Sequence, residues 1–323
     1  MKITEAEAKV MAAIGIRGDM SIAELSKATK LRQHICRNAF DSLLRREIIS
    51  RRVVVNSCRV GFMIFGIWFS LKPSEAKIRS KFLRFLLESP AIAYVGEFEG
   101  EYSFKIDTYV RSFIELHKVL AELSGKFGNI FSKESSNCIL YVIDYGYKFF
   151  APQIKRNQET AIGMVKETIT IDSIDHKILK ALSTSGNLPN SIIARKLAVA
   201  AATLDYRIKK LREKKVIVGY HAVAQVPMIQ SLGLVSYVHR LKLLKRDEST
   251  MKCISDFASS DPSVYTLTQN VGDFQIELCT TSESHKEEQR FCRRLEAELG
   301  DLIKEYSSVG IITHHKNNNY PFI

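Results

Sequence analysis

Hydrophobic positions recur along this chain with two different periods. Apolar residues spaced three or four apart, such as Val10, Met11 and Ile14, are typical of amphipathic helices. β-branched stretches such as residues 48–55 and 216–223 are typical of strands. The succession of these patterns predicts three short helices with a wing, then a β-α-β-β-α-β segment, and then the same series again.

The two series are related by a nearly constant shift along the chain, which indicates an internal duplication. When Lys9 is aligned with Lys177, the segment Lys9–Met11 falls on Lys177–Leu179. Further along, a slightly longer shift places Gly100–Phe104 on Gly272–Ile276. Apolar character is retained while most identities are lost. We therefore predict two diverged copies of one two-part unit.

The first part of each unit is predicted to be a winged helix-turn-helix, with three short helices and a hairpin. Capping residues or a proline mark the helix starts, as at Thr4, Ser21 and Pro189. The third helices are predicted over residues 32–46 and 201–214, and each is followed by a β-branched stretch that would form the wing.

The second part of each unit is predicted to be a ferredoxin-like effector domain. Its strands are expected near residues 62–71, 91–98, 102–109 and 138–146, and again near 231–242, 263–271, 273–280 and 307–315. Its helices are expected near 74–88 and 111–125, and again near 247–258 and 283–299. The fold class is thus α+β, in five segments: winged helix-turn-helix 1–58, effector domain 59–150, linker 151–170, winged helix-turn-helix 171–226 and effector domain 227–323.

The net charge of +12 lies almost wholly in the two predicted helix-turn-helix regions. Residues 1–60 carry 12 Lys/Arg and 6 Asp/Glu, and residues 161–220 carry 11 and 5, so each window has a net charge of +6. The rest of the chain is close to neutral. Two separate basic modules favour double-stranded DNA as a partner.

Several other classes of protein are disfavoured. The longest apolar stretch, Val60–Leu71, has 12 residues, whereas a membrane-spanning helix needs roughly 18–20. The six cysteines form no C-x-x-C pair and the eight histidines are dispersed, so neither a metal site nor a cofactor is predicted. No nucleophile stands beside an obvious base. We therefore expect a cytoplasmic protein that is not an enzyme.

Residues 171–220 resemble the Lrp/AsnC family of prokaryotic transcription regulators. The resemblance rests on the runs Ile171–Leu182, Ile193–Val199 and Arg207–Ile217. The glycine segments at 100–101 and 272–273 also resemble the Gly-Asp turn of the family's effector domain. The resemblance implies a tandem fusion of two units whose effector domains pair within one chain as a pseudo-dimer.

The third helices depart from the family pattern at three places. Arg32 and Ala200 replace the usual first Ser, and Glu47 and Lys215 replace the usual final Gly. Ala39 replaces an Arg that the second copy keeps as Arg207. Both helices should therefore lack a side-chain cap, and we expect their ends to be closed in another way. The first copy departs further from the DNA-reading pattern.

Helix three is predicted to lie in the major groove of DNA. The expected base-reading residues are Arg32, Gln33, His34, Arg37 and Asn38 in the first copy, and Ala201, Ala202, Thr203, Tyr206 and Arg207 in the second. The expected phosphate-contacting residues are Arg45, Arg46, Arg51, Arg52, Lys209, Lys210, Arg212 and Lys214. Arg suits guanine, Asn and Gln suit adenine, and phosphate contacts position the protein without reading sequence. The alternative is an ordinary solvated helix face, but the charge excess recurs on the same element in both copies.

The glycine segments have two interpretations. They can be plain hairpin turns between adjacent strands. The resemblance implies instead that a small effector such as an amino acid binds between the paired effector domains, near Gly100, Glu101, Gly272 and Asp273. The two carboxylates would then meet its ammonium group.

These features predict a sequence-specific DNA-binding transcription regulator with two unlike reading helices. One alternative is an enzyme resembling the fused sirohaem decarboxylases, which hold tetrapyrrole carboxylates with His and Arg residues; regions 51–59 and 221–228 lack a dense cluster of that kind. Another is a ligand sensor that acts only through protein partners. Further association of fused chains is left open by the sequence.

Overall fold

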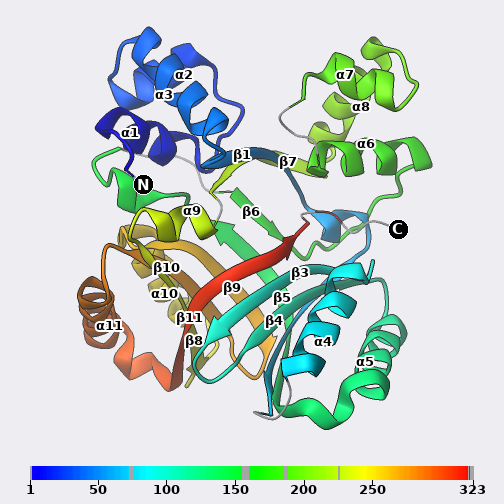
Figure 1. The fold of residues 1–323 in the computed structure, drawn as a ribbon, viewed down its shortest axis with the longest axis vertical. Coiled ribbons are helices and arrows are strands. Elements are labelled where there is room, and N and C mark those ends of the chain that lie inside the picture. Colours follow the sequence, from blue (N-terminus) through cyan, green and yellow to red (C-terminus); the bar gives the residue numbers. More distant parts are fainter. Residues whose placement is uncertain are drawn as a thin grey trace.

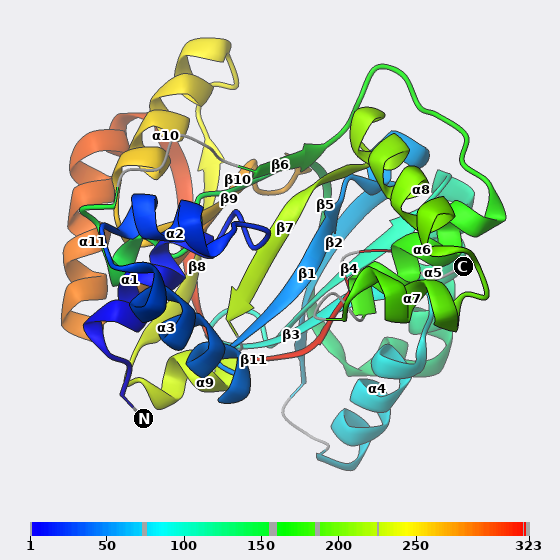
Figure 2. The ribbon, with the colours of Figure 1, turned by 90° about the horizontal axis from the view of Figure 1, so that it is seen from above.

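The computed structural model describes residues 2–72, 76–154, 160–184, 188–224, 226–318 and 320. Two three-helix units lie on one side of a large β-structure, and a two-stranded ribbon runs between them (Figure 1). Seen from above, the three-helix units stand on either side of that ribbon (Figure 2). Among the described residues, no helix is both long and apolar enough to cross a membrane.

The first three-helix unit is built on two predicted capping boxes. It comprises α1 (Glu5–Ile14), α2 (Ile22–Thr29) and α3 (Gln33–Arg45). Thr4 and Ser21 each accept a hydrogen bond from the backbone of a Glu three residues later, and that Glu reaches back to the cap. Both predicted starts are confirmed, and the apolar faces of the three helices meet in one core.

The second three-helix unit repeats the first. It comprises α6 (Ser173–Thr184), α7 (Asn190–Lys196) and α8 (Ala201–Glu213). Its core also includes residues of the first copy, among them Val53, Val55 and Phe62. The two units are therefore packed together through the segment that follows α3.

The expected wing hairpin within each unit is wrong in one respect. Each unit supplies a single strand, β1 (Ile49–Val55) or β7 (Ile217–Ala224), and the two strands pair with each other antiparallel. Arg52 stands opposite His221 in this register. A β-branched stretch predicts a strand but not its partner, so the sequence could not show that the ribbon is shared between the copies.

The two effector domains have equivalent elements in the same order. The first comprises β2 (Met63–Leu71), α4 (Ala76–Glu88), β3 (Ile92–Glu99), β4 (Phe104–Val110), α5 (Phe113–Phe127) and β5 (Phe131–Asp144). The second comprises β8 (Val235–Leu243), α10 (Glu248–Ser260), β9 (Val264–Gly272), β10 (Ile276–Ser282), α11 (His285–Leu299) and β11 (Ile303–Asn317). β5 begins earlier than predicted. Its first half is polar and shows no apolar alternation, so the sequence pattern did not reveal that this half pairs with β2.

The strands of both domains form one closed ring, here called the barrel. Each domain has the ferredoxin-like order, β5-β2-β4-β3 or β11-β8-β10-β9. β3 pairs with β11 and β9 pairs with β5, both antiparallel, so hydrogen bonds close both seams between the domains. The two copies thus pair within a single chain.

The structure adds a strand and a helix that the sequence pattern did not predict. β6 (Thr160–Gly163), in the region predicted as a linker, adds to the edge of β5. α9 (Val226–Ser231) is a short helix before β8 that the sequence pattern did not predict.

The interior of the barrel contains a buried group of charges. Glu277 accepts hydrogen bonds from Trp68 Nε1 and from Lys105 Nζ, each at 2.8 Å. Arg240 is fully buried, with its guanidinium over the rings of Trp68 and Tyr102. Burial alone would raise the pKa of Glu277, but the charges of Lys105 and Arg240 hold that pKa below its usual value. Its buried basic partners therefore favour the ionised form of the Glu277 carboxyl.

His314, on β11, makes stability depend on pH. Burial, with the nearby charge of Lys105, lowers the pKa of His314 from 6.5 to about 4. The unfolded chain therefore takes up a proton below pH 6.5 that the folded protein accepts only near pH 4. The corresponding stability is fully present above pH 6.5 and is lost as the pH falls towards 4, by up to ~3 kcal/mol.

Substitution His314→Gln should flatten this dependence. We expect the free energy of unfolding of the variant, measured in denaturant at several pH values, to vary less between pH 6.5 and 4 than that of the unmodified protein. Carboxylates also titrate in this range, so the difference between the two proteins is the quantity that counts. Parallel curves would contradict the assignment.

Candidate nucleic-acid interface

The two predicted reading helices, α3 and α8, have the same length of 13 residues and the same kind of start. Arg32 and Ala200 occupy the N-cap positions in extended backbone conformation, and neither makes a side-chain capping hydrogen bond. The predicted loss of the cap is confirmed. Each helix therefore presents its first backbone N–H groups uncapped by a side chain, and such groups favour a phosphate.

The C-terminal ends of these helices contradict our expectation. Glu47 and Lys215 adopt positive φ angles of 54° and 56°, the conformation that glycine would take here. The next residues, Ile48 and Val216, donate backbone hydrogen bonds to Leu43 and Leu211 at 3.0 and 2.9 Å. The ends are therefore closed in the usual left-handed way, at a cost of roughly 1–2 kcal/mol for each non-glycine residue.

In the first copy, the structure exposes every predicted base-reading side chain. Arg32, Gln33, His34, Arg37 and Asn38 are all solvent-exposed on α3, while Cys36, Ala39 and Leu43 point into the core. This face is rich in hydrogen-bonding groups and contains two guanidinium groups.

In the second copy, one predicted reading residue is placed differently. Ala201, Ala202, Thr203 and Tyr206 are exposed, and Tyr206 has 60% of its surface accessible. Arg207, however, is turned back onto the start of α6, where it forms ion pairs with Asp172, which precedes the helix, at 2.7 Å and with Asp175 at 2.9 Å. Its donors are directed at these acids here, which disfavours its predicted role in reading bases.

Arg46 has a comparable role in the first copy. It forms an ion pair at 2.9 Å with Glu7, which is buried and which falls on Asp175 when the two copies are aligned. Its second terminal nitrogen donates to the carbonyl oxygen of Lys2. Arg46 thus links the end of α3 to α1, and its predicted contact with phosphate stays a prediction. In both copies an arginine from helix three pairs with an acid of the first helix, but the two arginines come from different positions.

Substitution Arg207→Ala should therefore affect stability and not base preference. We expect a loss of about 1 kcal/mol in the free energy of unfolding, because two ion pairs between α8 and the start of α6 disappear. Lys209→Ala removes the same charge from an exposed site and serves as the control, with a change expected within about 0.5 kcal/mol. A change of preferred base with unaltered stability in Arg207→Ala would contradict this assignment.

The other predicted phosphate contacts fall into two groups. Arg45, Lys209, Lys210, Arg212 and Lys214 are exposed around the ends of α3 and α8. Arg51 and Arg52 are half-buried on β1 in the ribbon, and Arg52 donates to the carbonyl oxygen of Asn317 at 2.5 Å. Arg52 is accordingly a link between the ribbon and β11. The sequence did not reveal this, because a β-strand position gave no indication of which face the side chain would occupy.

A further arginine, which the sequence analysis did not select, connects the copies. Arg59 donates to the carbonyl oxygens of Lys214 and Glu167, at 3.2 and 2.7 Å. Arg212 lies 3.8 Å from Asp19 of the first unit. These contacts hold the second helix-turn-helix against the first copy, and no local motif could have identified them.

The two glycine turns lie at the seams of the barrel. Gly272, at φ +150°, packs so closely on β5 that an added Cβ would lie 2.4 Å from Asn137 Oδ1. Gly100, at φ +117°, lies beside Ser308 and Val309 of β11. Each turn therefore rests on the last strand of the other copy. Both positions favour glycine, which supports the hairpin interpretation without excluding a ligand nearby.

The two acidic effector candidates, Glu101 and Asp273, differ in whether other side chains already contact them. Glu101 is already held by Lys133 and by the hydroxyl group of Ser307. Burial would raise the pKa of the Glu101 carboxyl, but its hydrogen bonds with these two residues and the charge of Lys133 keep that pKa below its usual value. Asp273 is exposed at the tip of its turn.

Sequence reasoning missed a pair of small cavities between the ribbon and the barrel. Their volumes are about 200 and 150 Å³, and both are lined by Asp144, His221 and Thr266. His221 Nδ1 lies 3.2 Å from Asp144 Oδ2, and burial raises the pKa of Asp144. These residues come from β5, β7 and β9, so nothing in their spacing could have linked them.

The sequence of the second copy matches a known domain family. Residues 171–212 match the AsnC-type helix-turn-helix domain. The transcriptional regulator FL11 of Pyrococcus horikoshii is 24% identical over 153 residues, which is 47% of this chain and 97% of that protein. FL11 of Pyrococcus furiosus is 26% identical over 121 residues, 38% of this chain and 77% of that protein. The chain is related to the Lrp/AsnC regulators.

A structural match over nearly the whole length of this Lrp/AsnC relative is found with an enzyme. The siroheme decarboxylase NirDL has a TM-score of 0.61 with 10% identity, covering 98% of this chain and 94% of that chain. At this identity the match shows a shared two-unit fold and nothing about shared chemistry. The tandem arrangement of helix-turn-helix and ferredoxin-like domains is thus found in another solved structure.

Proposed function

We propose that this Lrp/AsnC relative is a sequence-specific DNA-binding transcription regulator of a prokaryotic cytoplasm. The observation that carries the proposal is that both reading helices expose polar and basic faces and lie in the two units on the same side of the barrel (Figure 1). The AsnC-type domain of the second copy supports the same function. The shared ribbon and the closed barrel hold the two helices at one separation.

The two reading faces differ, so the preferred DNA site should be asymmetric. α3 offers two arginines, a glutamine, a histidine and an asparagine, whereas α8 offers Ala202, Thr203 and Tyr206. Arginine and asparagine contacts discriminate guanine and adenine, while alanine and threonine suit the methyl group of thymine. A symmetric homodimer would read a palindrome, but this chain has no such symmetry.

We further propose modulation by a small effector at the seams of the barrel. Gly100 and Glu101 contact the last strand of the second copy, and Gly272 lies against that of the first, next to the exposed Asp273. A ligand bound there would contact both copies at once. The two carboxylates suit a compound that carries an ammonium group, such as an amino acid, and isothermal titration with individual amino acids tests this.

DNase footprinting on fragments of the surrounding genome tests the main proposal. We expect protection of a site with two unequal halves, and an affinity that falls steeply as the salt concentration rises. Protection confined to strict palindromes would contradict the asymmetric reading. Absence of salt-dependent binding to any fragment would favour a sensor that acts only through protein partners.

A tetrapyrrole enzyme is the alternative that the fold match to NirDL raises. Ligand sites for molecules of moderate size usually occupy about 300–1,000 Å³, and each of the cavities beside His221 is smaller. A larger groove of about 710 Å³ is lined by two acidic residues, Glu283 and Glu287, and by two basic ones, Lys2 and Arg294, so it offers no net positive charge to a polycarboxylate. A shift in the absorbance spectrum of sirohaem during incubation with the protein would favour the enzyme.

A further inference from the structure

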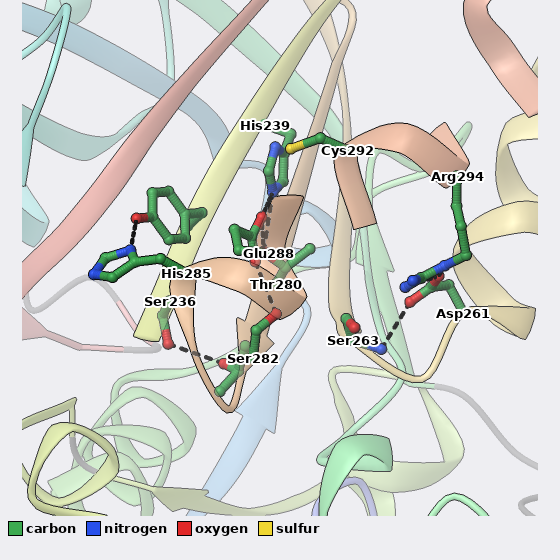
Figure 3. Close-up of polar contacts among 12 residues, drawn as sticks. Ser236, His239, Asp261, Ser263, Thr280, Ser282, His285, Glu288, Cys292 and Arg294 are labelled. Carbon is green, nitrogen blue, oxygen red and sulfur yellow. Dashed lines mark hydrogen bonds and ion pairs between the residues drawn. The ribbon is translucent and has the colours of Figure 1, made fainter. Parts of the chain in front are cut away.

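A polar cluster is buried between α11 and the second effector sheet. His239, in the middle of β8, is fully buried, and Glu288 on α11 is 5% exposed. Cys292 follows Glu288 by one helical turn and is half-buried. Figure 3 shows Glu288 and Cys292 both directed from α11 towards His239. One ligand atom from each of the three residues lies within 4.8 Å of the others.

The first copy provides an internal comparison for this cluster. When the effector domains are aligned with Gly100 on Gly272, the equivalent positions are Ile67, Leu116 and Leu120, and all three belong to the apolar core between α5 and its sheet. The fold therefore does not require polar groups here. Burying them in place of aliphatic side chains costs stability unless every group has a partner. The substitution of all three positions in one copy points to a chemical role.

The donor set is that of a transition-metal site. An imidazole, a thiol and a carboxylate are the side chains that bind zinc-like divalent ions. A tetrahedral Zn²⁺ site with bonds of about 2.0–2.3 Å sets its ligand atoms roughly 3–4 Å apart. The cluster needs only a contraction of about 1 Å to reach that geometry, and two ligands one turn apart on a helix suit it.

Neighbouring side chains already orient these groups. The carboxylate of Glu288 accepts hydrogen bonds from Ser282 at 2.8 Å and from Thr280 at 3.2 Å. The ring of His239 contacts Tyr306 Oη through Nδ1 at 2.7 Å. Metal-binding imidazoles and carboxylates are commonly held in this way by outer hydrogen bonds.

We propose that His239, Glu288 and Cys292 bind a zinc-class divalent cation. The ion replaces the direct contact of 2.8 Å between His239 Nε2 and Glu288 Oε1, and the Cys292 thiol releases its proton to solvent when its sulfur becomes a ligand. The half-buried side of the cluster at Cys292 gives the ion access from solvent, and a water molecule completes the coordination. The site ties α11 to β8, and it is independent of DNA binding.

Titration of the full-length, chelator-treated protein with Co²⁺ tests the proposal. We expect one equivalent to produce a sulfur-to-cobalt charge-transfer band together with the visible bands of a tetrahedral site, and Zn²⁺ should abolish both by displacement. Cys292→Ser should remove the charge-transfer band and weaken binding by at least about tenfold. Cys253→Ser changes an exposed cysteine on α10 and should leave the spectrum unaltered.

A second variant keeps the test independent of any single side chain. The triple substitution His239→Ile, Glu288→Leu and Cys292→Leu installs the residues of the first copy, which pack in an equivalent environment, so we expect a folded protein that no longer binds Co²⁺. Thermal unfolding with and without Zn²⁺ should show a rise in Tm for the unmodified protein and none for this variant. The proposal is overturned by absence of stoichiometric binding, by a charge-transfer band that persists in Cys292→Ser, or by equal binding to the triple variant.

Discussion

Replacing Glu277 with leucine should destabilise the protein by about 3–5 kcal/mol, as measured by chemical denaturation. Glu277 is buried in the barrel and accepts hydrogen bonds from Lys105 and Trp68. The substitution leaves Lys105 and Arg240 in the interior without the carboxylate that interacts with both. Asp107 remains 3.6 Å from Lys105. Burial raises the pKa of Asp107, however, so it compensates poorly.

Two comparisons make this prediction specific. Glu122→Ala breaks an exposed pair with Lys126 on α5 and should change the free energy of unfolding by no more than about 0.5 kcal/mol. Adding Lys105→Met to Glu277→Leu should recover part of the loss, because one of the two unpaired charges is then removed. A loss at Glu277 no larger than that at Glu122 would show that the buried charges are not coupled as described.

Reversing the charge of Lys209 and Lys210 together should weaken binding to DNA of any sequence by at least about 100-fold at moderate salt. Both lysines are exposed on α8. The double substitution to glutamate removes two phosphate contacts and adds two repulsions, and the dependence of affinity on salt should become shallower. Fluorescence anisotropy at several salt concentrations measures both effects.

The matched control is the double substitution of Lys77 and Lys81 to glutamate. These residues are exposed on α4, on the outside of the barrel and away from the reading helices, and the change in net charge is identical. We expect a small change in affinity only. Equal loss in the two double variants would mean that overall charge, and not the face of α8, determines binding.

The fold was predictable where the signal is local. Capping boxes at Thr4 and Ser21 gave the helix starts, and the repeated apolar pattern gave both ferredoxin-like domains. The pairing of β1 with β7 was not predictable, because a strand pattern does not identify a partner in the other half of the chain. Long-range pairing depends on the assembled fold.

The candidate site shows the same limit. The positions of Arg37 and Asn38 on helix three correctly predicted that both are exposed. The position of Arg207 could not show that it pairs with Asp172, just before α6. The cluster around His239 is invisible as a motif, since its residues come from β8 and α11, which are far apart in the sequence. The sequence indicates this cluster only when the two copies are aligned, because the alignment places the apolar Ile67 at the position of His239.

The closed barrel has a consequence for how the protein behaves on dilution. Because β3 meets β11 and β9 meets β5 within one chain, pairing of the two halves is an intramolecular event with a fixed effective concentration. Two separate chains would dissociate at low abundance, whereas here the paired state is maintained at a few copies per cell. Covalent connection also means that a change in one half is not duplicated in the other, so α3 and α8 are free to evolve towards different sequences.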